Sequence, residues 1–277
     1  MSKTISRNAA LSITLGAAAV ALPLMMLAPG AATRRQKSPF RGRNFAHRGL
    51  HSRDRSVPEN SLPAFERAAR EGYGIELDVR LTRDGELVVF HDDELERLCR
   101  VPGRVEETDW EALQKLRLLD SDCRIPLFSE VLETVRGRGA LIVELKSGSR
   151  NRELCEKVWA ALREYKGAFC IESFNPMILA WFRFHARGVL RGQLAAPMRS
   201  YGKSCSRVSA FLLSRCLLNF IARPQFIAYK LGRRPLTVRL AEFLGAMGVG
   251  WTSHEPRNEN GRDALIFEYY RPRLRYK

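Results

Sequence analysis

The sequence lacks the patterns that mark several common protein classes. Its six cysteines include no CxxC pair and no spacing typical of a metal site, so we expect free, mostly buried thiols, which suit a reducing compartment. We find no nucleic-acid-binding motif, no internal repeat and no low-complexity linker within residues 44–277. What remains is long enough for one large α/β domain with a sizeable core.

Negative charge is missing from the amino-terminal end of the chain. No acidic residue occurs in the first 43 positions, and residues 8–33 carry no charge at all. Ala9–Leu27 therefore has the length and composition of a membrane-spanning helix. The cations from Arg34 to Arg43 outweigh those before this stretch, so the positive-inside rule places the remaining chain in the cytoplasm. A cleaved signal peptide, implying secretion, is the competing interpretation, because Gly30-Ala31-Ala32 offers small residues.

The chain beyond residue 43 alternates strand and helix signals. Eight apolar segments of strand character are separated by helical patterns, which favours a parallel TIM (β/α)8 barrel. The expected strands cover residues 44–48, 75–81, 140–146, 169–174, 190–195, 226–230, 249–253 and 264–268. Helix signals include residues 62–70, a capping box at Thr108 and Glu111, a cap at Ser129, an amphipathic run from Asn151 to Tyr165, and proline-initiated helices at 176–186 and 236–247.

A hairpin adds one strand after the second. Residues 75–81 alternate apolar and charged side chains. Residues 87–90 form another apolar run, which with His91 makes an expected strand over 87–91. Asp84-Gly85 between the two segments is a strong turn signal. So short a connection forces the two strands antiparallel. We therefore expect three parts: an amino-terminal anchor or signal peptide over residues 1–33, a basic juxtamembrane linker over 34–43, and the barrel over 44–277.

Residues 208–222 are apolar except for Arg215. We prefer to interpret them as a core-facing helix of the barrel. The alternative is an interfacial helix that rests on a bilayer. The net charge of +16 also suits an anionic membrane surface or a phosphorylated small molecule, and we expect no nucleic-acid partner. The sequence gives no indication of the oligomeric state.

Carboxylates occur where a buried strand should be apolar. Glu76 and Asp78 lie at i and i+2 on one face of the second strand, and Glu144 and Lys146 repeat this spacing on the third. Taken alone, either pair fits the polar face of a surface strand. Buried like charges are costly unless a cation neutralises them. Functional groups of this barrel class lie at the carboxyl ends of the strands, so three carboxylates in one mouth indicate bound Mg²⁺ or Ca²⁺.

A series of short motifs points to one family. HRG at 47–49 is followed by PEN at 58–60, the Glu76-x-Asp78 strand, TRDG at 82–85, FHD at 90–92 and ELK at 144–146. In this order and spacing the motifs resemble those of the glycerophosphodiester phosphodiesterase family. The resemblance extends from about Phe40 to Pro272 and is to a membrane-anchored member of bacterial type. The resemblance implies metal-dependent hydrolysis of glycerophosphodiesters or lysophospholipids. The products would be glycerol 3-phosphate, or a lysophosphatidate, and an alcohol.

The resemblance also implies roles for particular residues. His47 and His91 match the general acid and base, Glu76, Asp78 and Glu144 the metal ligands, and Arg48 and Lys146 the phosphate-binding positions. We expect Glu59 and Asn60 to orient the loop after the first strand, with Asn60 near the metal. Trp251 is either a wall of the substrate pocket or a core residue. Glu172 and Gln193 are weaker pocket candidates. His51, His185 and His254 are expected at the surface or behind the site, and Glu268 receives no role.

Two other functions fit the same residues. A phosphoinositide- or sphingomyelin-type phospholipase resembles this family in its barrel and paired histidines, although Glu-x-Asp together with Glu144 favours a metal-dependent enzyme. A membrane-bound protein that keeps the barrel only as a binding module is the third interpretation. The presence of all seven polar positions argues against it, because an inactive site usually loses some of them.

Overall fold

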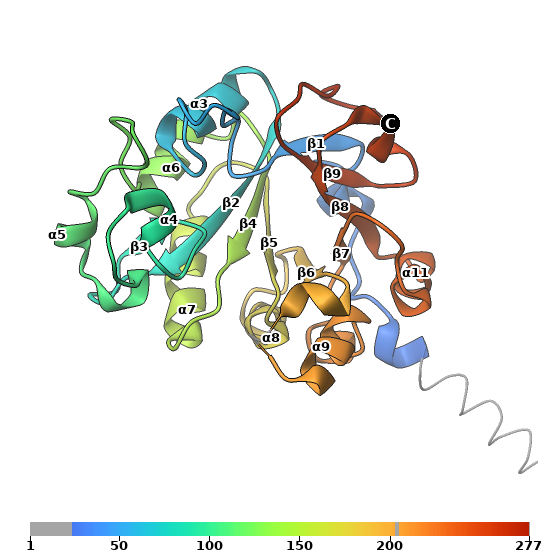
Figure 1. The fold of residues 1–277 in the computed structure, drawn as a ribbon. Coiled ribbons are helices and arrows are strands. Elements are labelled where there is room, and N and C mark those ends of the chain that lie inside the picture. The colour runs from blue at the N-terminus through green and yellow to red at the C-terminus, as the bar shows by residue number, and fades with distance from the viewer. Residues whose placement is uncertain (1–23, 203–204, 277) are drawn as a thin grey trace, which may run out of the picture.

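The protein is a closed barrel (Figure 1), described here by a computed structural model over residues 24–202 and 205–276. The sheet order is β1-β9-β8-β7-β6-β5-β4-β2-β3, and β1 also pairs with β2, which closes the ring. The ring pairings are parallel, whereas β3 runs antiparallel beside β2. The strands are β1 (Arg43–Ala46), β2 (Gly74–Leu81), β3 (Leu87–Val89), β4 (Leu141–Leu145), β5 (Phe169–Ser173), β6 (Arg191–Ala195), β7 (Phe226–Lys230), β8 (Met247–Ser253) and β9 (Ala264–Phe267). The predicted TIM barrel with an extra hairpin strand is confirmed.

Helices connect the strands around the outside of the ring (Figure 1). They are α2 (Arg34–Lys37), α3 (Leu62–Arg70), α4 (Glu96–Cys99), α5 (Trp110–Leu113), α6 (Phe128–Val135), α7 (Asn151–Leu162), α8 (Pro176–His185), α9 (Arg207–Ser214), α10 (Asn219–Ala222) and α11 (Leu236–Phe243), with 3-10 turns η1 (Val105–Glu107), η2 (Met198–Tyr201) and η3 (Pro256–Glu259). The segment between β3 and α6 has its own apolar cluster around Leu98, Leu113 and Ile125. It forms a compact insertion next to the hairpin.

Strand alternation separates the two faces of the barrel wall. Ile75, Leu77 and Val79 of β2 pack outward, in the same apolar cluster as residues of α3 and α6. Glu76 and Asp78, one position out of phase, lie inside the ring and are 2% and 1% exposed. Because successive strand side chains point to opposite faces, the apolar packing that anchors β2 to its helices also holds both carboxylates inside.

Aromatic side chains fill the end of the barrel opposite the mouth. Phe45 stacks on Phe40 with ring centroids 6.1 Å apart, and Phe226 lies in the same buried cluster. Gly192 makes room for the Phe226 ring, because a Cβ built on Gly192 would lie 1.9 Å from that ring. Aromatic side chains therefore fill the interior at this end, and the cavity lined by the described residues lies towards the carboxyl ends of the strands.

The amino-terminal segment lies against this closed end. Thr33 and Gln36 form a capping box on α2, Lys37 Nζ donates to the Gly245 carbonyl at 2.8 Å, and the Gly42 amide donates to the Asp263 carbonyl at 2.6 Å. The region we expected to be a juxtamembrane linker thus contacts the barrel directly. Most of the predicted anchor lies outside the described residues, and it stays a prediction. Within residues 24–202 and 205–276, no helix has the length and hydropathy to cross a bilayer.

Three local expectations are wrong. Thr108 does not cap α5: Asp109 occupies the N-cap position without a side-chain bond, and the Thr108 hydroxyl bonds to the Arg104 carbonyl instead. Ser129 lies inside α6 rather than capping it. Residues 208–222 do not form one core-facing helix but divide into α9 and α10, with Val208 and Phe211 exposed.

Replacing Gly192 with alanine should destabilise the barrel by about 1–3 kcal/mol, because the fully enclosed Phe226 ring has to move to admit a methyl group. Gly188 is the matched control, since a Cβ there meets nothing within 4 Å. Urea unfolding of both variants measures the difference. Equal midpoints for Gly192→Ala and Gly188→Ala would contradict the packing described for this end of the barrel.

Candidate active site

The three predicted metal ligands meet inside the barrel mouth. The β2–β4 register places Asp78 beside Glu144, and one oxygen each from Glu76, Asp78 and Glu144 lies within 4.8 Å of the others. All three side chains are buried. Their proximity follows from the strand register, which makes neighbours of residues far apart in the sequence.

Two cations from the same mouth contact this cluster. Lys146 Nζ lies 3.0 Å from Asp78 Oδ1 and 2.9 Å from Glu144 Oε1. Arg48 Nε is 3.3 Å from Asp78 Oδ2, and the Arg48 amide donates to Glu76 Oε2 at 3.0 Å. Arg48 adopts a left-handed conformation with φ 53°. Asn60, which we expected near the metal, donates to Asp78 Oδ2 at 2.8 Å, and Asp78 is one of the predicted metal ligands.

The pKa values of the three carboxyl groups are shifted in different directions, because their charged neighbours differ. Burial raises the pKa of Glu76, and the charges of Asp78 and Glu144 raise it further. Burial also raises the pKa of Glu144, although Lys146 opposes this. For Asp78 burial acts in the same direction, but Lys146, His91 and Arg48 outweigh it and hold the pKa well below its usual range. Without a further positive charge, Glu76 and Glu144 therefore tend to keep their protons.

A fourth carboxylate stands next to this cluster. Glu172 on β5 pairs in register with Glu144, is 1% exposed, and its Oε2 atom has no hydrogen-bond partner within the described residues. Burial, followed by the charges of Glu76 and Glu144, raises the pKa of Glu172 well above its usual range. The all-oxygen donor set, an unpartnered buried oxygen and the raised pKa values together fit a hard divalent cation such as Mg²⁺ or Ca²⁺.

Both predicted histidines line the cavity, and each is held by a carboxylate. His47 Nδ1 is 2.9 Å from Glu268 Oε2, and His91 Nδ1 is 2.6 Å from Asp92 Oδ1. A carboxylate accepts, so each ring donates through Nδ1 and leaves Nε2 for proton transfer. Burial lowers the pKa of His47 to about 4, although the hydrogen bond to Glu268 opposes this. His47 is therefore neutral at pH 7.

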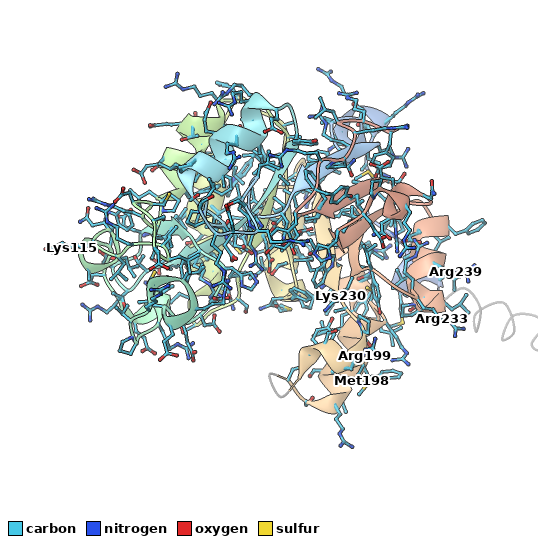
Figure 2. The ribbon with its side chains drawn as sticks, turned by 45° about the horizontal axis from the view of Figure 1, so that its top comes forward. Lys115, Met198, Arg199, Lys230, Arg233 and Arg239 are labelled. Atoms are coloured by element: carbon cyan, nitrogen blue, oxygen red, sulfur yellow. The ribbon has the colours of Figure 1, made fainter. Side chains whose placement is uncertain are left out.

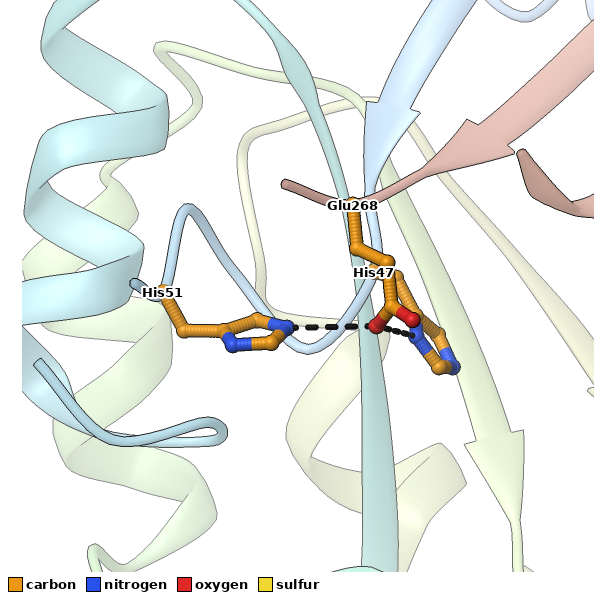
Figure 3. Close-up of side chains that lie close together, drawn as sticks. All are labelled: His47, His51 and Glu268. Atoms are coloured by element: carbon orange, nitrogen blue, oxygen red, sulfur yellow. Dashed lines mark hydrogen bonds and ion pairs between the residues drawn. The ribbon is translucent and has the colours of Figure 1, made fainter. Parts of the chain in front are cut away.

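Glu268 is the functional residue that the sequence did not reveal. Besides His47, its carboxylate contacts His51 Nε2 at 3.4 Å (Figure 3). It also contacts His254 Nε2 at 2.8 Å. Burial alone would raise the pKa of Glu268, but hydrogen bonds from the three histidines hold it far below its usual range. The one available signal was its place directly after the last strand, β9. Its histidine partners come from loops that no sequence pattern brings together.

The cavity of about 210 Å³ has one polar side and one apolar side. It is lined by His47, Arg48, Glu76, His91, Glu144, Lys146, Glu172, Phe174, Leu194, Trp251 and Ile266. Trp251 forms part of the apolar wall, with Phe174 edge-on at 5.9 Å and its indole nitrogen donating to the Ala228 carbonyl at 2.9 Å. Gln193 is absent from this lining, and its amide bonds instead to the Phe174 carbonyl at 3.1 Å.

Glu59 lies next to the site and binds two arginines. It accepts from Arg48 Nη1 at 2.6 Å and from Arg97 Nη1 and Nη2 at 2.9 and 2.7 Å. Arg97 also pairs with Asp92, the partner of His91. Glu59 thus ties the loop after β1 to the insertion that carries His91.

Comparison with known proteins places this arrangement in a family. The glycerophosphoryl diester phosphodiesterase family matches residues 47–216. The chain belongs to that family. The match begins at His47 and includes the carboxylates, Lys146 and His91, so the motifs and the geometry agree.

Other members of the family are similar over part of their length. The chain is 39% identical over 150 residues to a glycerophosphodiester phosphodiesterase of Bacillus altitudinis, with 50% of this chain and 60% of that protein covered. It is 29% identical over 166 residues to a lysophospholipase D of Rattus norvegicus, with 55% of this chain and 51% of that protein covered. The chain thus spans 60% or less of the length of these two relatives.

Solved structures of family members share the fold. A phosphodiesterase of Oleispira antarctica, in complex with the product sn-glycerol-3-phosphate, superposes with a TM-score of 0.68 at 22% identity, covering 83% of this chain and 94% of that chain. A glycerophosphodiester phosphodiesterase of Thermotoga maritima superposes with a TM-score of 0.60 at 25% identity, covering 81% and 93%. These likenesses extend beyond the matched family region to most of the barrel.

Replacing Glu59 with glutamine should change the acid stability of the protein. Burial alone would raise the pKa of Glu59, but Arg97 and Arg48 lower it from 4.5 to about 2. A lowered folded-state pKa stabilises the native state above about pH 4.5, and this contribution is lost as the pH falls towards about 2. The shift corresponds to about 3 kcal/mol at pH 7. Urea unfolding at several pH values should show a flatter pH dependence for Glu59→Gln. Glu133→Gln, on the exposed side of α6, should keep the dependence of the unmodified protein.

Proposed function

We propose that the protein is a metal-dependent phosphodiesterase that hydrolyses glycerophosphodiesters or lysophospholipids to glycerol 3-phosphate, or a lysophosphatidate, and an alcohol. The observation that carries the proposal is a single cavity that joins a carboxylate cluster, two cations and two imidazoles, each imidazole held by its own carboxylate. Named relatives support both substrate classes, since they include glycerophosphodiester phosphodiesterases and a lysophospholipase D.

Glu76, Asp78 and Glu144 are the residues that would hold the divalent cation, Mg²⁺ or Ca²⁺. When bound, the cation supplies positive charge for the non-bridging phosphate oxygens and relieves the repulsion among the three carboxylates. Arg48 and Lys146 lie at the same cluster, so their charges also face the phosphate and lower the cost of adding negative charge to it. Trp251 and Phe174, across the cavity, offer an apolar wall for the carbon skeleton of the substrate.

His47 and His91 each carry out one of the two proton transfers of the reaction. Neutral His47 accepts the proton of the attacking hydroxyl group at Nε2, and Glu268 stabilises the imidazolium that forms. His91 donates a proton to the leaving oxygen as the phosphorus–oxygen bond to the alcohol breaks. The attacking group is either water or the 2-hydroxyl of the glycerol, which would form a cyclic phosphate that water then opens.

The alternatives make different chemical demands. A phosphoinositide- or sphingomyelin-type phospholipase would need room for a large head group, and a panel of diesters separates it from the proposed activity. A binding module without catalysis would not need two imidazoles oriented by carboxylates in the same cavity as two cations. The arrangement of Glu268 and Asp92 behind the histidines therefore favours an enzyme.

The first test is removal of the metal. Purified protein treated with a chelator should lose the release of glycerol 3-phosphate from glycerophosphocholine, and Mg²⁺ or Ca²⁺ should restore it. Added metal should also raise the melting temperature, because it binds only the folded carboxylate cluster. The same assay on lysophosphatidylcholine and a phosphoinositide identifies the substrate class. Full turnover in excess chelator would refute the metal assignment.

The second test concerns the histidines and the carboxylate behind one of them. His47→Ala and His91→Ala should each lower kcat by roughly 10²–10⁴-fold without unfolding the protein. Glu268→Gln should lower kcat with little change in KM, since Glu268 orients His47 and does not touch the substrate. His185→Ala is the control, because His185 stacks on Trp181 at the surface of α8. Unchanged kcat in both histidine variants would overturn the proton-transfer roles.

A further inference from the structure

The half of the barrel from β5 to α11 contains almost no negative charge. From Ser173 to Ala241 the sequence has no aspartate or glutamate, while lysine and arginine recur throughout. Such a one-sided distribution produces a positive field over the elements that this stretch forms. These elements include η2, α9, β7 and α11, whose loops lie around one side of the mouth.

Several cations on this side are exposed and lack anionic partners, although Arg234 pairs with Glu242. Arg199, Arg233 and Arg239 are exposed and form no ion pair with any described residue. On the opposite half of the barrel, several exposed arginines are paired: Arg138 contacts Glu66, and Arg152 contacts Glu156. Figure 2 shows Arg233 and Arg239 on the right flank of the molecule, Met198 and Arg199 at its lower end and Lys230 between them, whereas Lys115 lies at the left edge.

Large apolar side chains are exposed among these cations. On α11, Leu236 and Phe243 are 67% and 86% exposed, and with Arg239 they follow the i, i+3, i+7 spacing of one helix face. On α9, Val208 is 69% exposed. We call the surface of residues 198–201, 207–214 and 230–243 the basic–apolar face. Cations interleaved with aromatic and aliphatic side chains are typical of protein surfaces that lie in the headgroup region of a bilayer.

The basic–apolar face adjoins the cavity. Lys230, at the carboxyl end of β7, lies over the Trp251 ring at 5.8 Å. Tyr201 of η2 contacts Phe174 edge-on at 6.2 Å, and Phe174 and Trp251 both line the cavity. A partner that contacts this face would therefore be separated from the apolar wall of the cavity by only one or two side chains.

The amino-terminal stretch reaches the barrel at the same place. Leu27 is buried in a cluster with Val238 and Ala241 of α11 and Tyr229 of β7, so the described chain starts beside the basic–apolar face (Figure 1). Residues 8–33, which lead to this point, carry no charge. The start of the described chain, exposed apolar residues and unpaired cations thus occur on one side of the molecule.

We propose that the basic–apolar face docks on the surface of an anionic lipid bilayer and holds the cavity against it. Anionic headgroups supply the negative charge that this half of the protein lacks, and the acyl boundary accepts Leu236, Val208 and Phe243. A nucleic acid would match the cations but would leave these apolar side chains in water. The docking is independent of the proposed hydrolysis, because it concerns binding and not turnover.

The test compares two variants that lose the same charge. Full-length protein is incubated with vesicles of phosphatidylcholine, with or without phosphatidylglycerol, and bound protein is separated by flotation. Arg199→Gln/Arg233→Gln/Arg239→Gln should bind the anionic vesicles on the order of 100-fold more weakly, since each cation near such a surface contributes about fivefold. The matched control is Arg100→Gln/Lys115→Gln/Arg152→Gln, on the opposite half of the barrel, which should bind nearly as well as the unmodified chain.

A second pair of substitutions tests the apolar part. Leu236→Ser/Phe243→Ser should weaken binding to anionic vesicles several-fold without lowering the melting temperature, since both side chains are exposed in the absence of lipid. The amino-terminal stretch is present in every variant, so it does not account for differences among them. Equal loss of binding in both charge variants, or no loss in either, would overturn the proposal. The same variants are also titrated with duplex DNA, and loss of DNA binding with unchanged vesicle binding would assign the face to nucleic acid instead.

Discussion

The ion pairs of Lys146 with Asp78 and Glu144 are the interaction on which the rest of the mouth depends. Three carboxylates in a buried space repel one another, and an isolated buried charge is costly. Lys146 reaches two of them at hydrogen-bonding distance, while Arg48 and Asn60 hold the other side of Asp78. The cluster stays partly anionic as a result, and a partly anionic cluster beside fixed cations suits both a metal ion and a phosphate group.

Different parts of the fold fix the positions of the carboxylates and of the two histidines. The metal-ligand candidates lie on β2 and β4, where the outward packing against α3 and α6 fixes them. The histidines lie on loops, and each depends on a carboxylate for its orientation. Glu59 connects these parts of the fold, because it bonds to Arg48 in the first loop and to Arg97 in the insertion. The strands thus fix the carboxylates, and hydrogen bonds orient the two imidazole rings.

Most strands were predictable because they are short, contain apolar or alternating residues, and are separated from one another by turn and helix signals. The Glu76-x-Asp78 and Glu144-x-Lys146 spacings also placed their side chains inside the barrel, since a period of two leaves no other arrangement once the apolar neighbours pack outward. Helix caps were less predictable: Thr108 bonds to a nearby carbonyl in preference to α5. Glu268 could not be assigned, because its partners His47, His51 and His254 come together only when the ring closes. The break between α9 and α10 follows from Cys216, whose φ of 53° no periodicity indicates.

Closure of the ring has a consequence for synthesis of the chain. The parallel partners of β1 are β2 and β9, and the Tyr276 amide donates to the Gly42 carbonyl at 3.0 Å. A ribosome makes β1 first and β9 last, and at about 5–20 residues per second the interval is roughly 10–45 s. During that interval one edge of β1 has no partner, and His47 has no Glu268. The hydrogen bond between His47 and Glu268 can therefore form only after β9 has been made, so a chain interrupted before β9 would hold its carboxylate cluster without the carboxylate that orients His47.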